Sequence, residues 1–355
     1  MLQKILIFVF STWVRIRSVI LPVRIFQGIP SEGCATFTFA YIGWDKRKLS
    51  YFLSSLFQSF ERVPGKRYIP VWKIEYKTKV LSDICDMALL EIDSEITKKH
   101  ARNIYGFLLP RWLKMHLDVD TSFEILSDKR NHIRRMIRKY DLSLSIGTQE
   151  EDFRFFYDKM FKPYIQARHK GSAVIATFED MFNHPTMESA RILFVIHEGK
   201  RIGGVYEQFF DGIPYLNAVG ILDGSSEYLK IGAVSATYCF TVDEYKRNQI
   251  QRVNIGGTSP LLRDGLTKFK ISLGAKVSKF ESQDSIRLKL LLLKYSPGLS
   301  SYLMNSGFVH IDQDQIHCAL FQNRLSEESD PDFEKQVRHA KSMETDHLEY
   351  IKITP

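Results

Sequence analysis

The 355-residue chain has only four cysteines, and they lie far apart in the sequence. They are Cys34, Cys85, Cys239 and Cys318, each among apolar or small neighbours. This spacing leaves no Cys-x-x-Cys motif and no disulfide framework, so we expect buried thiols and a reducing compartment. The ten histidines show no ligand spacing of the His-Glu-x-x-His kind, and we expect no metal.

The N-terminus has no apolar run long enough to cross a membrane, which needs about 20 residues. The run Ile5–Phe10 is short, Arg15 and Arg17 interrupt any extension of it, and no cleavage site for a signal peptide is clear. The mixture of apolar and cationic residues in residues 1–30 suits a segment lying in the membrane interface. It suits equally a segment packed on the protein's own core. We therefore expect a cytoplasmic chain, and peripheral contact with the inner face of the membrane is one of these two interpretations.

The positive charge is uneven along the chain. Residues 1–150 carry 24 Lys and Arg against 15 Asp and Glu, whereas the remainder carries 25 against 26. This excess indicates an anionic partner for the N-terminal part, or a solvated basic surface without one. A helix expected at 124–140 concentrates the charge, with apolar residues at i, i+3, i+4 and i+7 and a basic opposite face. Arg134 and Arg135 on that face are candidate anion-binding residues for a phosphate, a nucleotide or RNA; DNA is not expected.

The most informative stretch is 254–277, which reads Asn-Ile-Gly-Gly-Thr-Ser-Pro-Leu-Leu-Arg-Asp-Gly-Leu-Thr-Lys-Phe-Lys-Ile-Ser-Leu-Gly-Ala-Lys-Val. A short strand ends at Ile255, and Gly256 and Gly257 let the backbone turn sharply or approach a ligand closely. A polar loop and a helix expected at 261–273 follow. A helix that begins at such a turn can present N–H groups to a phosphate or a carbonyl oxygen.

This run resembles the late strand–loop–helix segment of the FemAB-like, or CelD-like, branch of the GNAT acyltransferase superfamily. In that branch a G-x-S/T-P-x-x-x-D-G-L-x-x-F-K-x-x-x-G-A pattern recurs, and the resemblance covers about residues 83–280. It implies an α/β GNAT fold, with a mixed central sheet, flanking helices and an abbreviated N-terminal GNAT-like unit. The expected divisions are a membrane-interface segment at 1–30, the abbreviated unit at 31–140, the acyltransferase core at 141–322 and a tail at 323–355, partly disordered from Ser326.

Hydrophobic periodicity and turn residues predict elements in the GNAT order from residue 142 onward. The expected strands are 71–81, 84–92, 142–146, 191–197, 202–210, 214–221, 253–255, 308–311 and 315–321. The expected helices are 96–109, 124–140, 149–168, 177–182, 227–247, 261–273 and 286–295. In GNAT folds, the resemblance implies, the third and fourth strands (here 202–210 and 214–221) splay apart to seat the donor.

The resemblance implies an N-acyltransferase that moves an acyl group from a thioester donor to an amine acceptor, on a cell-envelope precursor or a polysaccharide sugar. Acyl-CoA is the expected co-substrate, and no bound cofactor is expected. Many GNAT enzymes bind the coenzyme A pyrophosphate with an R/Q-x-x-G-x-G/A turn. At that place residues 229–234 read Leu-Lys-Ile-Gly-Ala-Val, which lacks both the leading Arg or Gln and the final small residue. Two alternatives stay open: an aminoacyl-tRNA-dependent transferase, and a non-catalytic module that binds an anionic lipid or polymer.

Attack of an amine on an acyl carbonyl needs a positioned carbonyl and stabilisation of the oxyanion. Lys270 matches the Phe-Lys lysine of the family, which implies a role in offsetting negative charge or binding donor phosphate. The alternative is a salt bridge to Asp264, and replacement of Lys270 by Met is expected to leave stability almost unchanged. Glu207 could take a proton directly or through water, or could be an exposed strand residue.

The other candidates fall into two groups. Donor binding is assigned to Asn254, Gly256, Gly257, Lys230, Arg263, Asp264 and Lys268. Asp264 is interpreted more readily as a loop-ordering or helix N-terminal residue. Acceptor binding is assigned to Tyr215 and Asn217, which we place on one face of the same strand, with core packing as the alternative for Tyr215.

Overall fold

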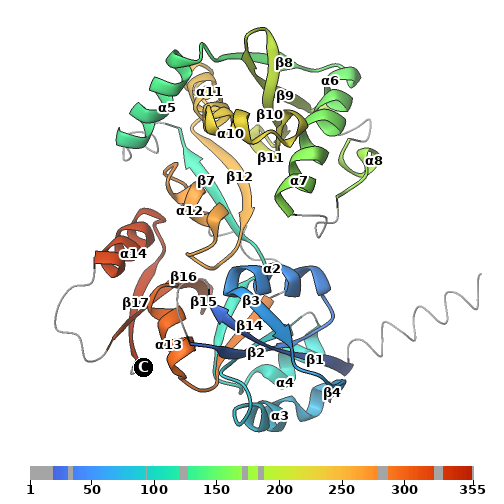
Figure 1. The fold of residues 1–355 in the computed structure, drawn as a ribbon, viewed down its shortest axis with the longest axis vertical. Helices are drawn as coiled ribbons and strands as arrows, with labels where there is room; N and C mark the ends of the chain where they lie inside the picture. Colours follow the sequence, from blue (N-terminus) through green and yellow to red (C-terminus); the bar gives the residue numbers. More distant parts are fainter. Residues whose placement is uncertain are drawn as a thin grey trace, which may run out of the picture. The chain divides into compact units, whose positions relative to one another are not determined.

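The computed structural model describes residues 19–30, 35–92, 94–119, 127–169, 175–182, 188–278, 287–323 and 331–353. The chain divides into two compact units, and Figure 1 labels their elements. The first unit comprises Met1–Leu113, Thr258–Lys268 and Ser278–Pro355, and the second comprises Lys114–Gly257 and Phe269–Val277. The boundary expected at residue 140 falls inside the second unit, because each unit is assembled from segments that are far apart in the sequence.

The first unit contains a ten-stranded mixed sheet in the order β17-β16-β15-β6-β14-β5-β2-β1-β3, with β4 paired to β1. Its strands are β1 (Ile20–Pro30), β2 (Phe37–Ile42), β3 (Phe57–Arg62), β4 (Arg67–Pro70), β5 (Met87–Ile92), β6 (Phe107–Pro110), β14 (Arg287–Leu292), β15 (Phe308–Asp312), β16 (Gln315–Asn323) and β17 (His347–Ile353). Its helices are α2 (Lys46–Leu56), α3 (Ile74–Leu81), α4 (Glu95–Ala101), α13 (Pro297–Met304) and α14 (Pro331–Ser342), with a 3-10 turn at Val71–Lys73. One buried cluster lies under α2 and α13, and another under α3 and α4.

Three sequence-based assignments in this unit are wrong. Residues 71–81, expected as a strand, form the 3-10 turn and helix α3, which buries Ile74, Thr78 and Leu81 at helical spacing. The helix expected at 96–109 ends at Ala101, and strand β6 follows. The helix expected at 286–295 is strand β14, which lies between β5 and β6. A short apolar run of this kind does not reveal its type by periodicity alone, and here the neighbouring strands decide it.

The two ends of the chain join the sheet of the first unit. Residues 20–30 form β1, which buries Leu21, Val23 and Ile25 and pairs with β2, β3 and β4, in agreement with the interpretation of a segment packed on the protein's own core. Residues 1–18 lie outside the described residues. The acidic start of the tail, 326–330, also lies outside them, and the tail continues as helix α14 and strand β17, which pairs in parallel with β16. No helix among the described residues is long and apolar enough to cross a membrane.

The second unit contains a seven-stranded sheet in the order β13-β7-β12-β11-β10-β9-β8. Its strands are β7 (Leu113–Asp118), β8 (Ser143–Gly147), β9 (Ala190–His197), β10 (Lys200–Phe210), β11 (Ile213–Ile221), β12 (Arg252–Thr258) and β13 (Lys276–Val277). Its helices are α5 (Ser127–Lys139), α6 (Glu150–Phe155), the π-helix η2 (Phe156–Phe161), α7 (Lys162–His169), α8 (Phe178–Met181), α10 (Ser226–Lys230) and α11 (Ala233–Arg247), and α12 (Gly265–Ile271) crosses the boundary between the units. The expected order of helices, three antiparallel strands, helix, strand and helix is confirmed, as is the mixed α/β fold with flanking helices.

Helices cover both faces of this second sheet (Figure 1). On one face α6, η2 and α8 bury an aromatic cluster against Phe194 and Tyr206. Gly220 of β11 allows η2 to approach closely, since a Cβ there would lie 2.7 Å from the Cβ of Met160. On the other face α11 packs against β9, β10 and β11, with Ala233 and Ala236 buried next to Val195.

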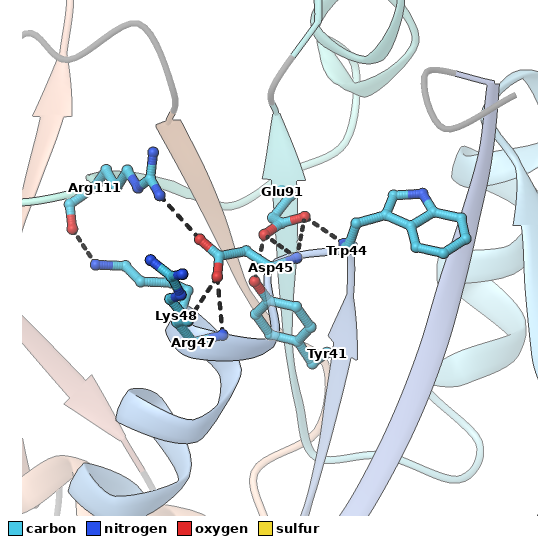
Figure 2. Close-up of polar contacts among 7 residues, drawn as sticks. All are labelled: Tyr41, Trp44, Asp45, Arg47, Lys48, Glu91 and Arg111. Carbon is cyan, nitrogen blue, oxygen red and sulfur yellow. Dashed lines mark hydrogen bonds and ion pairs between the residues drawn. The ribbon is translucent and has the colours of Figure 1, made fainter. Parts of the chain in front are cut away.

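A buried carboxylate organises the junction between β2, β5 and α2 in the first unit. Glu91, 4% exposed, accepts hydrogen bonds from the Tyr41 hydroxyl (2.5 Å) and from the backbone N–H groups of Trp44 (2.5 Å) and Asp45 (3.0 Å). Burial raises the pKa of the Glu91 carboxyl against the opposing effect of these donors. Figure 2 shows how Asp45 continues the network: it caps α2 and binds Arg111 Nη2 at 3.0 Å.

Gly43 is the position at which this junction is most sensitive to added volume. It follows β2 in the turn leading to α2, and a Cβ there would collide with the Glu91 carboxylate. We expect Gly43→Ala to lower the free energy of unfolding by about 1–3 kcal/mol, measured by chemical denaturation. Gly265→Ala is the control, since no atom lies within 4 Å of its Cβ position. Equal free energies of unfolding for the two variants would show that the residues around Glu91 can accommodate the added methyl group.

Candidate functional site

The sheet of the second unit has a weak seam between β11 and β12. These strands run parallel and share one partner pair, Tyr215 opposite Asn254. In contrast, β10 and β11 pair along their whole length, from Gly203 opposite Ile221 to Phe210 opposite Ile213. The expectation that the strands 202–210 and 214–221 splay apart is therefore wrong, and the interrupted pairing lies one strand further along the sheet. Backbone groups of β11 and β12 face each other along this seam without a regular ladder.

A glycine kink stands next to the seam. Gly256 has φ +76°, in the left-handed region that favours glycine, and its N–H donates to Asn254 Oδ1 at 2.8 Å. Asn254 is buried, so its side chain holds the turn from inside the unit. Gly256 adopts the glycine-type conformation that was expected, but the strand expected to end at Ile255 continues as β12 to Thr258, so Gly256 is a kink within the strand. Asn254 acts as a local brace for this kink.

Lys270 supports the same kink from helix α12. Its side chain is 3% exposed, and Nζ donates to the backbone carbonyls of Ile255 (2.7 Å) and Gly257 (3.0 Å). These two carbonyls flank Gly256, and a Cβ at Gly256 would lie 3.8 Å from Nζ. Because glycine has no side chain, a ligand placed on Gly256 would lie close to a buried positive charge.

Asp264 is a helix-capping residue. Its Oδ1 accepts from the N–H groups of Leu266 and Thr267, both at 3.0 Å, at the start of α12. Its Oδ2 accepts from the Tyr51 hydroxyl at 2.8 Å. The loop-ordering interpretation of Asp264 agrees with this geometry. Arg263, half-buried, and Lys268, exposed, belong with Asp264 to the first unit, whereas the other donor-binding candidates belong to the second.

Glu207 is fully buried, which corrects the interpretation of an exposed strand residue. Its carboxylate is paired with Arg191 of β9, and Arg191 Nη1 binds Glu244 of α11 at 2.7 Å. Burial raises the pKa of the Glu207 carboxyl, and the Arg191 guanidinium opposes this shift. The three side chains bind β9 and β10 to α11. The sequence did not point to Arg191 and Glu244, because no local pattern indicates a contact between residues so far apart in the chain.

Tyr215 and Asn217 lie on the other face of the sheet from Glu207. A β-bulge in the β10–β11 pair occurs at Glu207, and beyond it Gln208 lies opposite Tyr215. Gln208 Oε1 accepts from Asn217 Nδ2 at 3.4 Å, so both acceptor-binding candidates share the face of Gln208. Asn217 is exposed and Tyr215 half-buried, with its ring at 5.1 Å from that of Phe210.

A second group of side chains that the sequence did not indicate positions the beginning of β12. Asp118 of β7 binds Lys276 Nζ at 2.9 Å and Arg252 Nε at 3.2 Å, and His116 lies 3.5 Å away. Although burial opposes it, the bond from Lys276 keeps the pKa of the Asp118 carboxyl below its usual value. These ion pairs join β7, β12 and β13, and so position the strand that carries the kink.

The N-terminus of α11 forms a second polar feature in this unit. Gly232, with φ +89°, precedes the helix, and no side chain caps it. The first N–H groups of a helix have no acceptor within it and attract anions. Lys230 is exposed two residues earlier. The basic helix α5 packs beside this point, where Met136 lies 3.7 Å from a Cβ position on Gly232 (Figure 1).

The side chains of α5 divide as the sequence predicted. Ile133 is buried, and Ile137 packs against the cluster that contains Ala233 and Ala236 of α11. Arg134 and Arg135 are exposed, and Arg135 Nη2 lies 3.0 Å from Nδ1 of His132. The structure therefore brings Lys230, the α11 N-terminus and the cationic helix into one region of the second unit. That region contains a helix end without a side-chain cap, where the positive end of the helix dipole lies.

A search with models of protein families finds no match, and a search of curated protein sequences finds none either. Solved structures with a similar fold include FemX, at 10% identity and TM-score 0.38, with 75% of this chain and 84% of that chain covered. They also include L-PGS from Bacillus licheniformis (11%, TM-score 0.32, 78% and 86%) and a GCN5-related N-acetyltransferase from Sphaerobacter thermophilus (13%, TM-score 0.30, 73% and 74%).

The contacts of Lys270 change one expectation. Lys270→Met leaves the carbonyls of Ile255 and Gly257 without their donor, so the free energy of unfolding should fall by about 1–3 kcal/mol. Lys246→Met, at an exposed position in the last turn of α11 in the same unit, should change it by less than about 0.5 kcal/mol. Urea denaturation of both variants measures the difference. Identical values would mean that Lys270 does not brace the kink.

Proposed function

We propose that this chain is an N-acyltransferase that moves an acyl group from a thioester donor to an amine acceptor. The observation that carries this proposal is the kink at Gly256, where the Lys270 ammonium lies under a backbone position without a side chain. The kink stands beside a seam in which β11 and β12 share one partner pair. The Gly-x-Ser/Thr-Pro to Phe-Lys resemblance of residues 256–270 agrees with this assignment.

The reaction needs the groups that this seam offers. A neutral amine attacks the thioester carbonyl, its new C–N bond forms, and negative charge builds on the carbonyl oxygen. In this proposal the Lys270 charge and backbone N–H groups beside the kink would stabilise that oxygen, whereas the N–H of Gly256 is engaged by Asn254. The C–S bond then breaks, the thiolate leaves, and the amine loses a proton to water or to the thiolate. Because Lys270 is buried, its charge would interact more strongly with a nearby oxyanion than a charge in bulk water would.

Acyl-CoA is the proposed donor, and its phosphates would bind at the N-terminus of α11. The backbone N–H groups there, the exposed Lys230 and the basic face of α5 provide positive potential on one side of the sheet. This arrangement compensates for the departure of residues 229–234 from the usual pyrophosphate-binding turn. Coenzyme A would be consumed and released as a co-substrate.

The amine acceptor is proposed to bind along β11, where Tyr215 and Asn217 share a face with Gln208. An exposed amide and a half-buried phenol supply hydrogen bonds to a polar, sugar-like or envelope-derived amine. Glu207 has no direct role in this proposal, because its carboxylate lies on the opposite face and is engaged by Arg191. It acts by holding β10, the neighbour of β11, against α11.

A second candidate, transfer from aminoacyl-tRNA, is favoured by the exposed face of α5. That face carries Arg134, Arg135, Arg138 and Lys139 within six residues, more positive charge than a single diphosphate needs. A row of cationic side chains suits the repeated phosphates of an RNA backbone. Both candidates use an acyl carbonyl at the same kink, and they differ in the carrier of the acyl group.

Replacement of Lys270 tests the kink itself. We expect Lys270→Met to lower the rate of acyl transfer by roughly ten- to a thousand-fold, the scale for losing one group that stabilises an oxyanion. The rate of thiol release from acetyl-CoA with a panel of amines measures this, at a temperature at which the variant is folded by circular dichroism. Unchanged turnover by folded Lys270→Met would remove Lys270 from the site.

Charge reversal on α5 tests the donor site, and the salt dependence of binding separates the two carriers. We expect Arg134→Glu combined with Arg135→Glu to weaken donor binding, whereas reversal of the exposed Arg338 of α14 should not. For tRNA, about four phosphate contacts give a log–log slope of affinity against salt near −3, and acyl-CoA gives a shallower slope. Titration calorimetry with acetyl-CoA and filter binding with tRNA measure both. If the wild-type protein binds neither at low salt, both proposals are wrong.

A further inference from the structure

Three histidines and a glutamate meet on one face of the sheet in the first unit. His310 of β15 lies opposite His317 of β16, and His317 lies opposite His347 of β17. Glu349 is two residues beyond His347, on the same face of the edge strand β17. The sequence could not show this, because the four residues come from three strands and their spacing matches no metal motif.

The distances within the cluster suit a metal ion. His310 Nε2 lies 3.1 Å from Glu349 Oε2, and His317 Nδ1 lies 2.7 Å from Glu349 Oε1. One ligand atom from each of these three residues lies within 4.8 Å of the other two. Ligands at 2.0–2.2 Å around a tetrahedral zinc ion are about 3.3 Å apart, so small side-chain rotations would bring all three to the metal.

The hydrogen bonding of His317 supports the same interpretation. Both of its ring nitrogens are buried, and neither has a hydrogen-bond partner of acceptable geometry among the described residues. The short approach to Glu349 Oε1 therefore brings a carboxylate beside a ring nitrogen without a well-aligned bond. Buried polar atoms are nearly always satisfied, and a shared cation would satisfy this pair.

Aromatic neighbours hold His310 in place. It is 5% exposed, with its ring at 5.0 Å from that of Phe107 and at 6.1 Å from that of Phe308. This packing fixes the imidazole with Nε2 at 3.1 Å from Glu349 Oε2.

We propose that His310, His317 and Glu349 bind one divalent transition-metal ion of the zinc class. Two imidazole nitrogens and one carboxylate oxygen are the donor set that zinc accepts with one position open. The ring of His347 lies 4.8 Å from that of His317, but its Nε2 is hydrogen-bonded to Gln315 Oε1 at 3.0 Å, so His347 is not part of the donor set. The ion would clamp the edge strand β17 to β16 and β15, and so attach the C-terminal segment to the sheet.

The test uses untagged full-length protein, treated with EDTA and then desalted. Titration with Co²⁺, followed by visible absorption, should show one site per chain, and Zn²⁺ should displace the Co²⁺. Zn²⁺ should also raise the melting temperature in a concentration-dependent way, because it binds the folded state. Absence of stoichiometric Co²⁺ binding by the wild-type protein overturns the proposal.

Variants locate the site. His317→Gln and Glu349→Gln should each weaken Co²⁺ binding by at least about tenfold, the lower end of the effect of removing even an outer-shell partner. His100→Gln on α4 and His339→Gln on α14, in the same unit, are matched controls and should bind as the wild type does. Glu349→Gln preserves shape on an edge strand and so keeps the test valid if His317→Gln does not fold. Wild-type affinity in Glu349→Gln, or an equal loss in the controls, contradicts the assignment.

Discussion

The second unit depends on the bond between one buried ammonium and two backbone carbonyls. Lys270 donates to Ile255 and Gly257, and so holds β12 on both sides of Gly256, whose φ is positive. Asn254 holds the same kink through the N–H of Gly256. The kink is therefore braced by two side chains while β12 keeps its place between β7 and β11. A preorganised backbone of this kind costs no reorganisation when charge develops on a bound carbonyl.

Buried charge serves two different purposes in this chain. Around Glu91 the donors are backbone N–H groups and a phenol, which satisfy the carboxylate and order the start of α2. Around Glu207 the donor is Arg191, shared with Glu244, so two strands and a helix are joined by charge. Loss of one partner in either group would leave a buried charge uncompensated, which is more costly than the bond itself. The Glu207 network positions strands of the second unit, which carries the candidate site, whereas the Glu91 network orders the first unit.

The candidate site was foreseen in part. The conformation of Gly256, the capping role of Asp264 and the amphipathic character of α5 follow from local rules on glycine, helix caps and periodicity, and these agree with the structure, although β12 runs past Ile255 to Thr258. The partners of Lys270 and Glu207 did not follow from such rules. A lysine near an aspartate suggests a salt bridge, yet the fold places two carbonyls within reach of Lys270. The paired strands 202–210 and 214–221, expected to splay, show that a resemblance can predict a seam and misplace it.

The sequence by itself determined the class of the fold, the order of elements in the second unit and the glycine kink, because hydrophobic period, turn residues and φ preferences act over a few residues. Only the tertiary structure decided that 287–292 is a strand, that the tail from residue 331 joins the sheet, and that His310, His317 and Glu349 meet. Each of these depends on neighbours contributed from elsewhere in the chain. A short apolar run adopts the strand conformation when strands on either side pair with it. The register of those strands decides which side chains become neighbours.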